Sequence, residues 1–202
     1  MRRILGVIAF LSLASPTSYG AGLQLGEPQY GGTGCPMGSA AIALSPDQQA
    51  LSILFDQYVV EAGGSRAFNR KNCNIAIPVH VPQGYSVSVI AIDYRGFTGL
   101  PSGGRAQLSV NYFLTSSGNP NPGPGVRTSK TFYGPLSSDY IKSDSLGLEA
   151  IVWSGCGADA ILRANTTLLV NSNHRRDQAM ATVDSADVSS GIIYHLRWKS
   201  CH

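Results

Sequence analysis

Three consecutive residues, Asp93, Tyr94 and Arg95, carry side chains that suit recognition of a polar ligand. The guanidinium donates a fork of hydrogen bonds, the carboxylate accepts hydrogen bonds, and the tyrosine ring offers a flat stacking surface. They follow a run of apolar residues that predicts a buried strand. The alternative interpretation is structural: an Asp–Arg pair caps the sheet and fixes a turn at Gly96.

Further candidates for the same ligand lie earlier in the chain. Asp56 and Tyr58 repeat the pairing of acid and aromatic near the end of another predicted strand, and Arg70 supplies a cation close in sequence to Cys73. The candidate ligand-binding residues are therefore Asp56, Tyr58, Arg70, Asp93, Tyr94 and Arg95. The binding hypothesis requires that they converge in one concave site.

Catalytic signatures are missing from the sequence. None of the four histidines belongs to a GxSxG or HExxH pattern, so no catalytic residue is assigned. A hydrolase would have to use an acid and a base drawn from Asp56, Asp93 and His80. The cysteines are too far apart in sequence for a zinc ribbon or finger, and we expect no metal and no cofactor. A binding protein is favoured over an enzyme.

The first twenty residues have the layout of a secretory signal peptide. Arg2 and Arg3 precede an apolar run, Ile4 to Ala14, and small residues follow near Gly20. The apolar run is much shorter than the ~20 residues of a membrane-spanning helix. We therefore expect residues 1–20 to be removed and the protein to be secreted, to the extracellular space, the periplasm or the cell surface, without a membrane anchor.

Charge is nearly balanced once Arg2 and Arg3 are removed from the total of 15 Lys and Arg against 12 Asp and Glu. A nearly neutral chain with scattered charges lacks the basic footprint of a nucleic-acid-binding protein. The partners expected for a secreted protein of this composition are extracellular carbohydrate or protein, and nucleic acid is not expected.

All four cysteines, Cys35, Cys73, Cys156 and Cys201, lie in the exported part. An even number in an oxidising compartment predicts two disulfides, although four cysteines allow three pairings. Proximity in sequence favours Cys35 with Cys73 and Cys156 with Cys201. On the chain-entropy account, each bond would contribute ~4 kcal/mol to stability.

Alternating apolar residues predict that most of the chain forms strands. Residues 75–81 alternate with a period of two, Pro82 to Gly84 predicts a hairpin turn, and the run from Tyr85 to Ile92 predicts a strand covered on both faces. Further strands are expected at 39–44, 51–60, 106–115, 131–133, 139–142, 148–153, 160–170, 179–183 and 192–199. In the last of these, His195, Arg197 and Lys199 fall on the solvent face, opposite Trp198.

Many short strands without a convincing amphipathic helix predict an all-β fold, a single-domain antiparallel β-sandwich with two disulfides over residues 21–202. The segment 116–130 is rich in proline and glycine. We expect it to form a long loop within this domain, although a linker between two domains is the alternative.

Seven short motifs, with x for any residue, occur in order along the exported part: YGGTGCP from Tyr30, FDxY from Phe55, RKNC from Arg70, PQGY from Pro82, DYRG from Asp93, WSxCG from Trp153 and LRWKxC from Leu196. This ordered set resembles the domain of unknown function 4360 family, small secreted proteins of fungi and bacteria. The resemblance implies secretion, four paired cysteines and one domain, and it implies no particular activity.

The leading functional hypothesis is a secreted, disulfide-stabilised β-sandwich that binds an extracellular ligand such as carbohydrate or a cell-wall surface. One alternative is a secreted hydrolase with an Asp/His site. The other is a structural or host-interaction protein that binds a protein partner, which an exposed apolar patch would favour.

Overall fold

The computed structural model describes residues 22–116, 125–147, 151–184 and 191–201, and this part of the chain contains strands and no helix. The strands are β1 (Gln24–Leu25), β2 (Gln29–Gly31), β3 (Ala40–Leu44), β4 (Ala50–Phe55), β5 (Val59–Ala62), β6 (Phe68–His80), β7 (Tyr85–Leu100), β8 (Arg105–Ser116), β9 (Val126–Tyr133), β10 (Leu136–Ser145), β11 (Ala160–Asn171), β12 (Ala179–Thr182) and β13 (Ile192–Ser200). Within the described ranges, no helix is long and apolar enough to cross a membrane.

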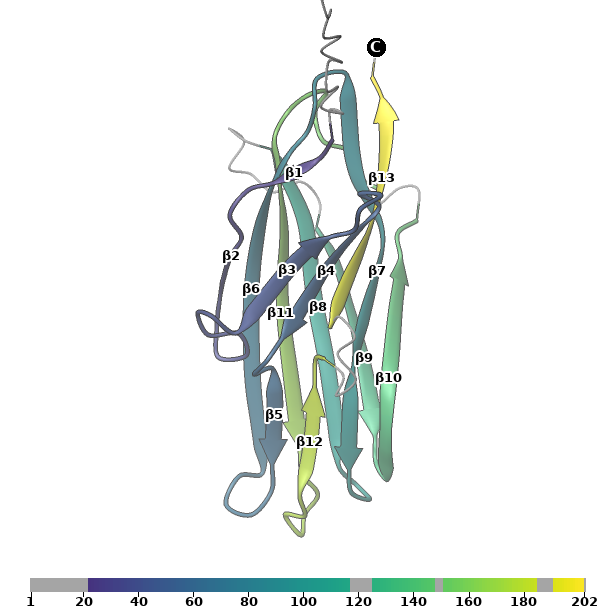
Figure 1. The fold of residues 1–202 in the computed structure, drawn as a ribbon. Helices are drawn as coiled ribbons and strands as arrows, with labels where there is room; N and C mark the ends of the chain where they lie inside the picture. The colour runs from purple at the N-terminus through teal and green to yellow at the C-terminus, as the bar shows by residue number, and fades with distance from the viewer. Residues whose placement is uncertain (1–21, 117–124, 148–150, 185–190, 202) are drawn as a thin grey trace, which may run out of the picture.

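The strands form two antiparallel sheets that face each other (Figure 1). Sheet A has the order β1-β6-β11-β8-β9, with β2 also paired to β6. Sheet B has the order β3-β4-β13-β7-β12-β5, and β10 pairs with the opposite edge of β7. The predicted all-β sandwich is confirmed.

Alternation along the strands builds the core between the sheets. In β11 every second side chain from Ala160 to Val170 is buried, and these residues face the buried side chains of β4, β7 and β13 in sheet B. Because successive side chains of a strand point to opposite faces, the intervening residues lie on the outer faces of the sandwich. Any ligand that binds to a sheet must therefore contact these intervening residues.

Both favoured disulfides are present. Cys35 bonds to Cys73 and joins the loop after β2 to β6, and Cys156 bonds to Cys201 at the C-terminal end of β13. The described cysteines include no free thiol.

Several strand boundaries differ from the sequence-based expectation. Residues 51–60 are divided between β4 and β5, and β7 continues well beyond Ile92. The loop expected over 116–130 is shorter, since β8 includes Ser116 and β9 begins at Val126. Residues 151–153 do not form the strand expected for 148–153, because this segment bonds to β7 at only a few points. The expected signal peptide, 117–124 and 148–150 lie outside the described residues.

Candidate ligand-binding site

Asp93 and Arg95 lie on the outer face of sheet B, where alternation along β7 places both side chains. The Asp93 carboxylate lies 2.8 Å from the imidazole Nε2 of His195 on β13. The side chains of His195 and Asp93 are 40% and 22% exposed. The two residues are thus a half-exposed polar pair that links two neighbouring strands.

The surroundings of Asp93 stabilise its ionised form. Partial burial acts to raise the pKa of Asp93, but hydrogen bonds from Ser143 and His195, with the nearby charges of His195 and Arg95, outweigh it and hold this pKa below its ordinary value. At neutral pH the carboxylate therefore accepts hydrogen bonds from both neighbouring strands.

Tyr58 and Tyr94 are core residues rather than surface ones. The Tyr58 hydroxyl lies 3.0 Å from the Thr166 hydroxyl of sheet A, and Tyr58 itself is 1% exposed. Tyr94 is fully buried between Asp93 and Arg95, because adjacent strand residues point to opposite faces. Burial raises the pKa of both phenols far above the ordinary tyrosine value.

Asp56 and Arg70 do not join this pair in one site. Asp56 is exposed in the turn after β4. Arg70 is exposed on β6, three residues before the buried Cys73. An odd separation along a strand puts the two side chains on opposite faces, so Arg70 lies on the outer face of sheet A. The described structure brings together Asp93 and Arg95 from the six candidates and leaves the other four at separate positions.

Gly96 does not form the turn that the structural interpretation of Asp93 and Arg95 required. It lies in the interior of β7, and its register partner on β10 is Tyr140. The Tyr140 hydroxyl crosses Gly96 and donates a hydrogen bond of 2.7 Å to the Thr182 carbonyl on β12. A Cβ atom at Gly96 would lie 2.1 Å from that carbonyl oxygen. Glycine is required here by a close approach inside the sheet.

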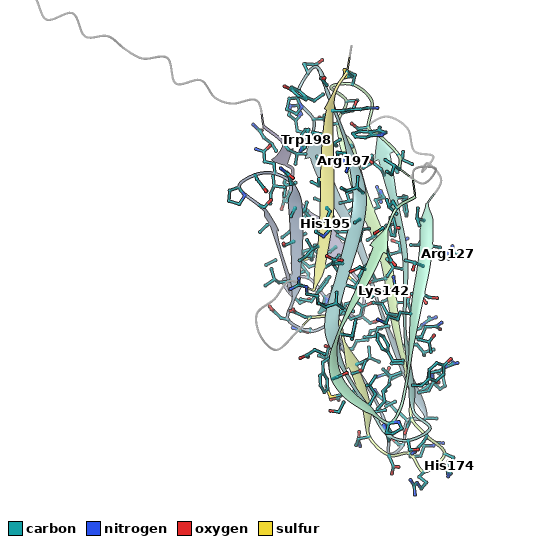
Figure 2. All side chains as sticks on the ribbon, turned by 90° about the vertical axis from the view of Figure 1, so that its right-hand side faces the viewer. Arg127, Lys142, His174, His195, Arg197 and Trp198 are labelled. Atoms are coloured by element: carbon teal, nitrogen blue, oxygen red, sulfur yellow. A yellow bond between two sulfur atoms is a disulfide. The ribbon has the colours of Figure 1, made fainter. Side chains whose placement is uncertain are left out.

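The acid and base considered for a hydrolase also lie apart. His80 Nδ1 is 2.6 Å from the carboxylate of Asp159. His80 ends β6 in sheet A, whereas Asp93 lies on the outer face of sheet B beside His195. Figure 2 shows His174 at the opposite end of the molecule from Arg197 and Trp198. Among the described residues, no group of three or more His, Cys, Asp or Glu could hold a metal ion.

An open groove lies further along β7, on the outer face of sheet B. It is a hollow of ≈ 570 Å³ whose lining includes Phe97, Leu136 and Met180 as apolar side chains. Glu61, Ser137 and Gln178 contribute a carboxylate, a hydroxyl and an amide. We call this hollow the outer groove. Phe97 follows Asp93 and Arg95 on the same face of β7, so the sequence cluster leads into it.

Strand register builds the outer groove as one row across four strands. Gly99 pairs with Ser137 on β10 and with Met180 on β12, and Met180 pairs with Glu61 on β5. At ~4.8 Å between strands, this row spans about 14 Å. A Cβ atom at Gly99 would lie 3.2 Å from the Phe97 ring and 3.3 Å from Met180, so both side chains close over the glycine and form the floor.

A second polar cluster lies at the edge between the two sheets. Lys142 on β10 is 5% exposed, and its Nζ donates to the Thr128 hydroxyl on β9 at 2.9 Å and to the Asp144 carboxylate. The same Nζ lies 5.0 Å from the centre of the Tyr94 ring. Lys142 and Asp144 are therefore a buried ion pair that connects the edge strands of the two sheets.

Sequence reasoning did not find the groove residues or the buried ion pair. Glu61, Leu136 and Met180 belong to different strands and carry no local motif. The one available signal was Phe97, an aromatic residue directly after the Asp93 to Gly96 motif. Lys142 was available as a charged residue within a predicted strand.

The fold and its groove define a class of protein: a disulfide-bonded β-sandwich with a partly apolar hollow on one outer face. The chain belongs to the family described as Domain of unknown function (DUF4360), which matches residues 21–201. It is 39% identical over 175 residues to an uncharacterized secreted protein of Arthroderma benhamiae, and the match covers 85% of this chain and 69% of that relative. The predicted family is confirmed, and the protein is secreted.

A solved structure shares a likeness with the described fold. It is TmCBM61 in complex with β-1,4-galactotriose, 11% identical, with a TM-score of 0.28 and coverage of 86% of this chain and 88% of that chain.

Proposed function

We propose that this protein binds an extracellular carbohydrate in the outer groove. The observation that carries the proposal is the composition of the groove, in which the Phe97 ring and Met180 form an apolar floor beside Glu61, Ser137 and Gln178. A sugar ring has an apolar face and a rim of hydroxyls. The floor matches the face, and the carboxylate, hydroxyl and amide match the rim.

Binding suits the groove better than hydrolysis does. Glycoside hydrolysis ordinarily needs two carboxyl groups about 5–10 Å apart. The described lining contains one carboxylate, Glu61. Another carboxylate, Asp139, lies on β10, where it pairs with Phe97 of β7. β10 is three strand spacings, or about 14 Å, from β5, the strand that carries Glu61. Asp93 and Arg95, above Phe97 on β7, would extend the polar contacts of a longer ligand.

The test is a pull-down with insoluble chitin, β-glucan, xylan and galactan, followed by calorimetric titration with oligosaccharides of whichever polymer is retained. Phe97→Ala removes the aromatic floor, and we expect it to weaken binding by about tenfold or more, the usual effect of deleting a central aromatic contact. Glu61→Gln tests the rim and should weaken binding less.

Tyr85→Ala is the matched control, because it removes an aromatic side chain, 43% exposed, from the other end of β7. It should bind like the wild-type protein. The assignment of carbohydrate binding to the outer groove would be contradicted if the Tyr85 and Phe97 variants lost affinity equally. It would also be contradicted if Phe97→Ala kept the full affinity.

A further inference from the structure

A row of basic side chains occupies the outer face of sheet B toward the end opposite the outer groove. His195, Arg197 and Lys199 alternate along β13 and point outward, and Arg197 and Lys199 are exposed. We call these three residues the cationic strip. Figure 2 shows His195 and Arg197 following one another along this strand. Lys199 pairs with Ser86, eleven residues or about 35 Å before Phe97 on β7, and His195 pairs with Ala91, six residues or about 20 Å before Phe97.

Two of these three basic side chains have no acidic partner among the described residues. His195 contacts Asp93, but neither Arg197 nor Lys199 forms an ion pair with any described residue. Both are consecutive outward residues, so their Cα atoms lie about 7 Å apart along the strand. Their charges are therefore available to a ligand.

A tryptophan lies beside the strip. The Nζ of Lys199 lies 4.3 Å from the centre of the Trp153 ring, a cation–π contact. Trp153 belongs to the segment 151–154, which is fixed to β7 by hydrogen bonds from the Ser154 amide to the Val87 carbonyl at 2.9 Å and from the Ser88 hydroxyl to the Val152 carbonyl at 2.7 Å. The backbone that carries the indole is thus held against β7.

The second disulfide, Cys156–Cys201, links the segment that carries Trp153 to the end of β13 that carries Lys199. Cys156 follows Trp153 by three residues and Cys201 follows Lys199 by two, and the two cysteines are bonded. A covalent link this close to both side chains reduces the conformational entropy that binding would otherwise cost. The arrangement of guanidinium, ammonium and indole is therefore preorganised.

We propose that the cationic strip and Trp153 bind an acidic polysaccharide, a chain of sugars that carry carboxylates. Arg197 would take a carboxylate by a two-pronged hydrogen bond, Lys199 would neutralise the next charge, and the indole would contact the apolar face of a sugar ring. This surface and its ligand class are distinct from the neutral carbohydrate assigned to the outer groove. A nucleic acid is the less favoured polyanion, since the nearly balanced chain lacks the extended basic surface that follows a phosphate backbone.

The experiment measures affinity of the full exported chain for polygalacturonate at low and high salt, with neutral galactan and duplex DNA in parallel. We expect binding to polygalacturonate that weakens as salt rises, and little binding of galactan at the strip. The variant Arg197→Gln/Lys199→Gln should lose about tenfold or more in affinity. Trp153→Ala should lose affinity as well, and Phe97→Ala should not.

Arg66→Gln/Arg105→Gln is the matched control, because it removes the same charge from two exposed arginines outside the strip. It should retain the wild-type affinity for polygalacturonate. Equal loss in both double variants would overturn the proposal, as would equal or tighter binding of DNA or a wild-type protein that ignores polygalacturonate. Phe97→Ala separates the two proposals, because failure at the groove leaves binding at the strip intact. Arg197 and Lys199 are exposed, so their replacement keeps the fold.

Discussion

At the scale of single residues, Gly96 shows how one missing side chain allows a contact across three strands. The Tyr140 ring reaches from β10 over β7 and bonds to the Thr182 carbonyl of β12. It also lies against Phe132 of sheet A, with ring centres 4.6 Å apart. Gly96 therefore joins three strands of sheet B and one residue of sheet A in a single packing arrangement.

Gly96→Ala should destabilise the protein by about 2–4 kcal/mol, from overpacking and from loss of the Tyr140 hydrogen bond. The added Cβ would meet the Thr182 carbonyl at 2.1 Å and the Tyr140 hydroxyl at 2.7 Å. Chemical denaturation monitored by fluorescence measures the change. Gly31→Ala is the control, since a Cβ there has no neighbour within 4 Å. A Gly96 variant as stable as the control would contradict this account.

Asp93→Asn should lower stability at neutral pH by about 0.5–1 kcal/mol, because it weakens the pair with His195. The pKa of Asp93 is lowered in the folded state, so its contribution is complete above the ordinary value of 3.8 and is lost as pH falls through the folded-state pKa. The free energies of unfolding of the wild-type protein and the variant should therefore become equal at acid pH. Denaturation curves at a series of pH values measure the difference, and a constant gap down to the lowest pH would refute it. Asp139→Asn, on the next strand, serves as the comparison.

At the scale of elements, the edge strands β9 and β10 of the two sheets are joined by side-chain contacts rather than by backbone hydrogen bonds. β9 ends sheet A and β10 ends sheet B, and the Lys142–Asp144 pair meets the Thr128 hydroxyl across the gap between them. Lys130 adds a hydrogen bond of 3.1 Å to the Ile141 carbonyl. These polar contacts hold two edge strands that would otherwise expose unpaired groups.

Asp144→Ala should destabilise the protein by about 3–5 kcal/mol, because it leaves the Lys142 ammonium buried without its counter-ion. Lys142 and Asp144 are 6% and 15% exposed, so Asp144 is the partner with more access to water. Lys142→Met should therefore lower the free energy of unfolding less than Asp144→Ala does, and the double variant Lys142→Met/Asp144→Ala should lose less than the sum of the two single losses. Urea denaturation of the four proteins forms a double-mutant cycle, in which additive losses would exclude a coupled pair.

The alternation of apolar residues was enough to predict most strands, and proximity in sequence was enough to pair the cysteines. Register was not predictable, because a period of two assigns a face to each residue without assigning a neighbour. The row that joins Ser137, Gly99, Met180 and Glu61 depends on register alone. Asp93, Tyr94 and Arg95 look like one cluster in sequence, but the Tyr94 side chain points to the inner face of sheet B and the other two point to its outer face.

At the scale of the whole molecule, the space between the sheets holds several buried tyrosines. Tyr58, Tyr94, Tyr140 and Tyr194 come from different strands and loops, and all are at most 8% exposed. The hydroxyls of Tyr94 and Tyr194 have no hydrogen-bond partner in the described structure. Burial raises the pKa of all four above the ordinary 10.0 and that of Tyr112 to about 12. The sandwich is therefore built around phenols that must stay neutral.

This arrangement predicts cooperative unfolding in alkali. Because the folded state keeps these protons longer than the unfolded state does, their contribution is complete below pH 10.0 and is lost as pH rises toward the folded-state values. Each such tyrosine lowers the free energy of unfolding by up to about 1.4 kcal/mol per pH unit in that window. Denaturation and tyrosinate absorbance, followed together, should show one joint transition.

Tyr194→Phe should make stability fall less steeply above pH 10.0 without reducing it at neutral pH, since the lost hydroxyl has no partner in the described structure. Ionisation of all the tyrosines in a protein that stays folded would contradict the prediction.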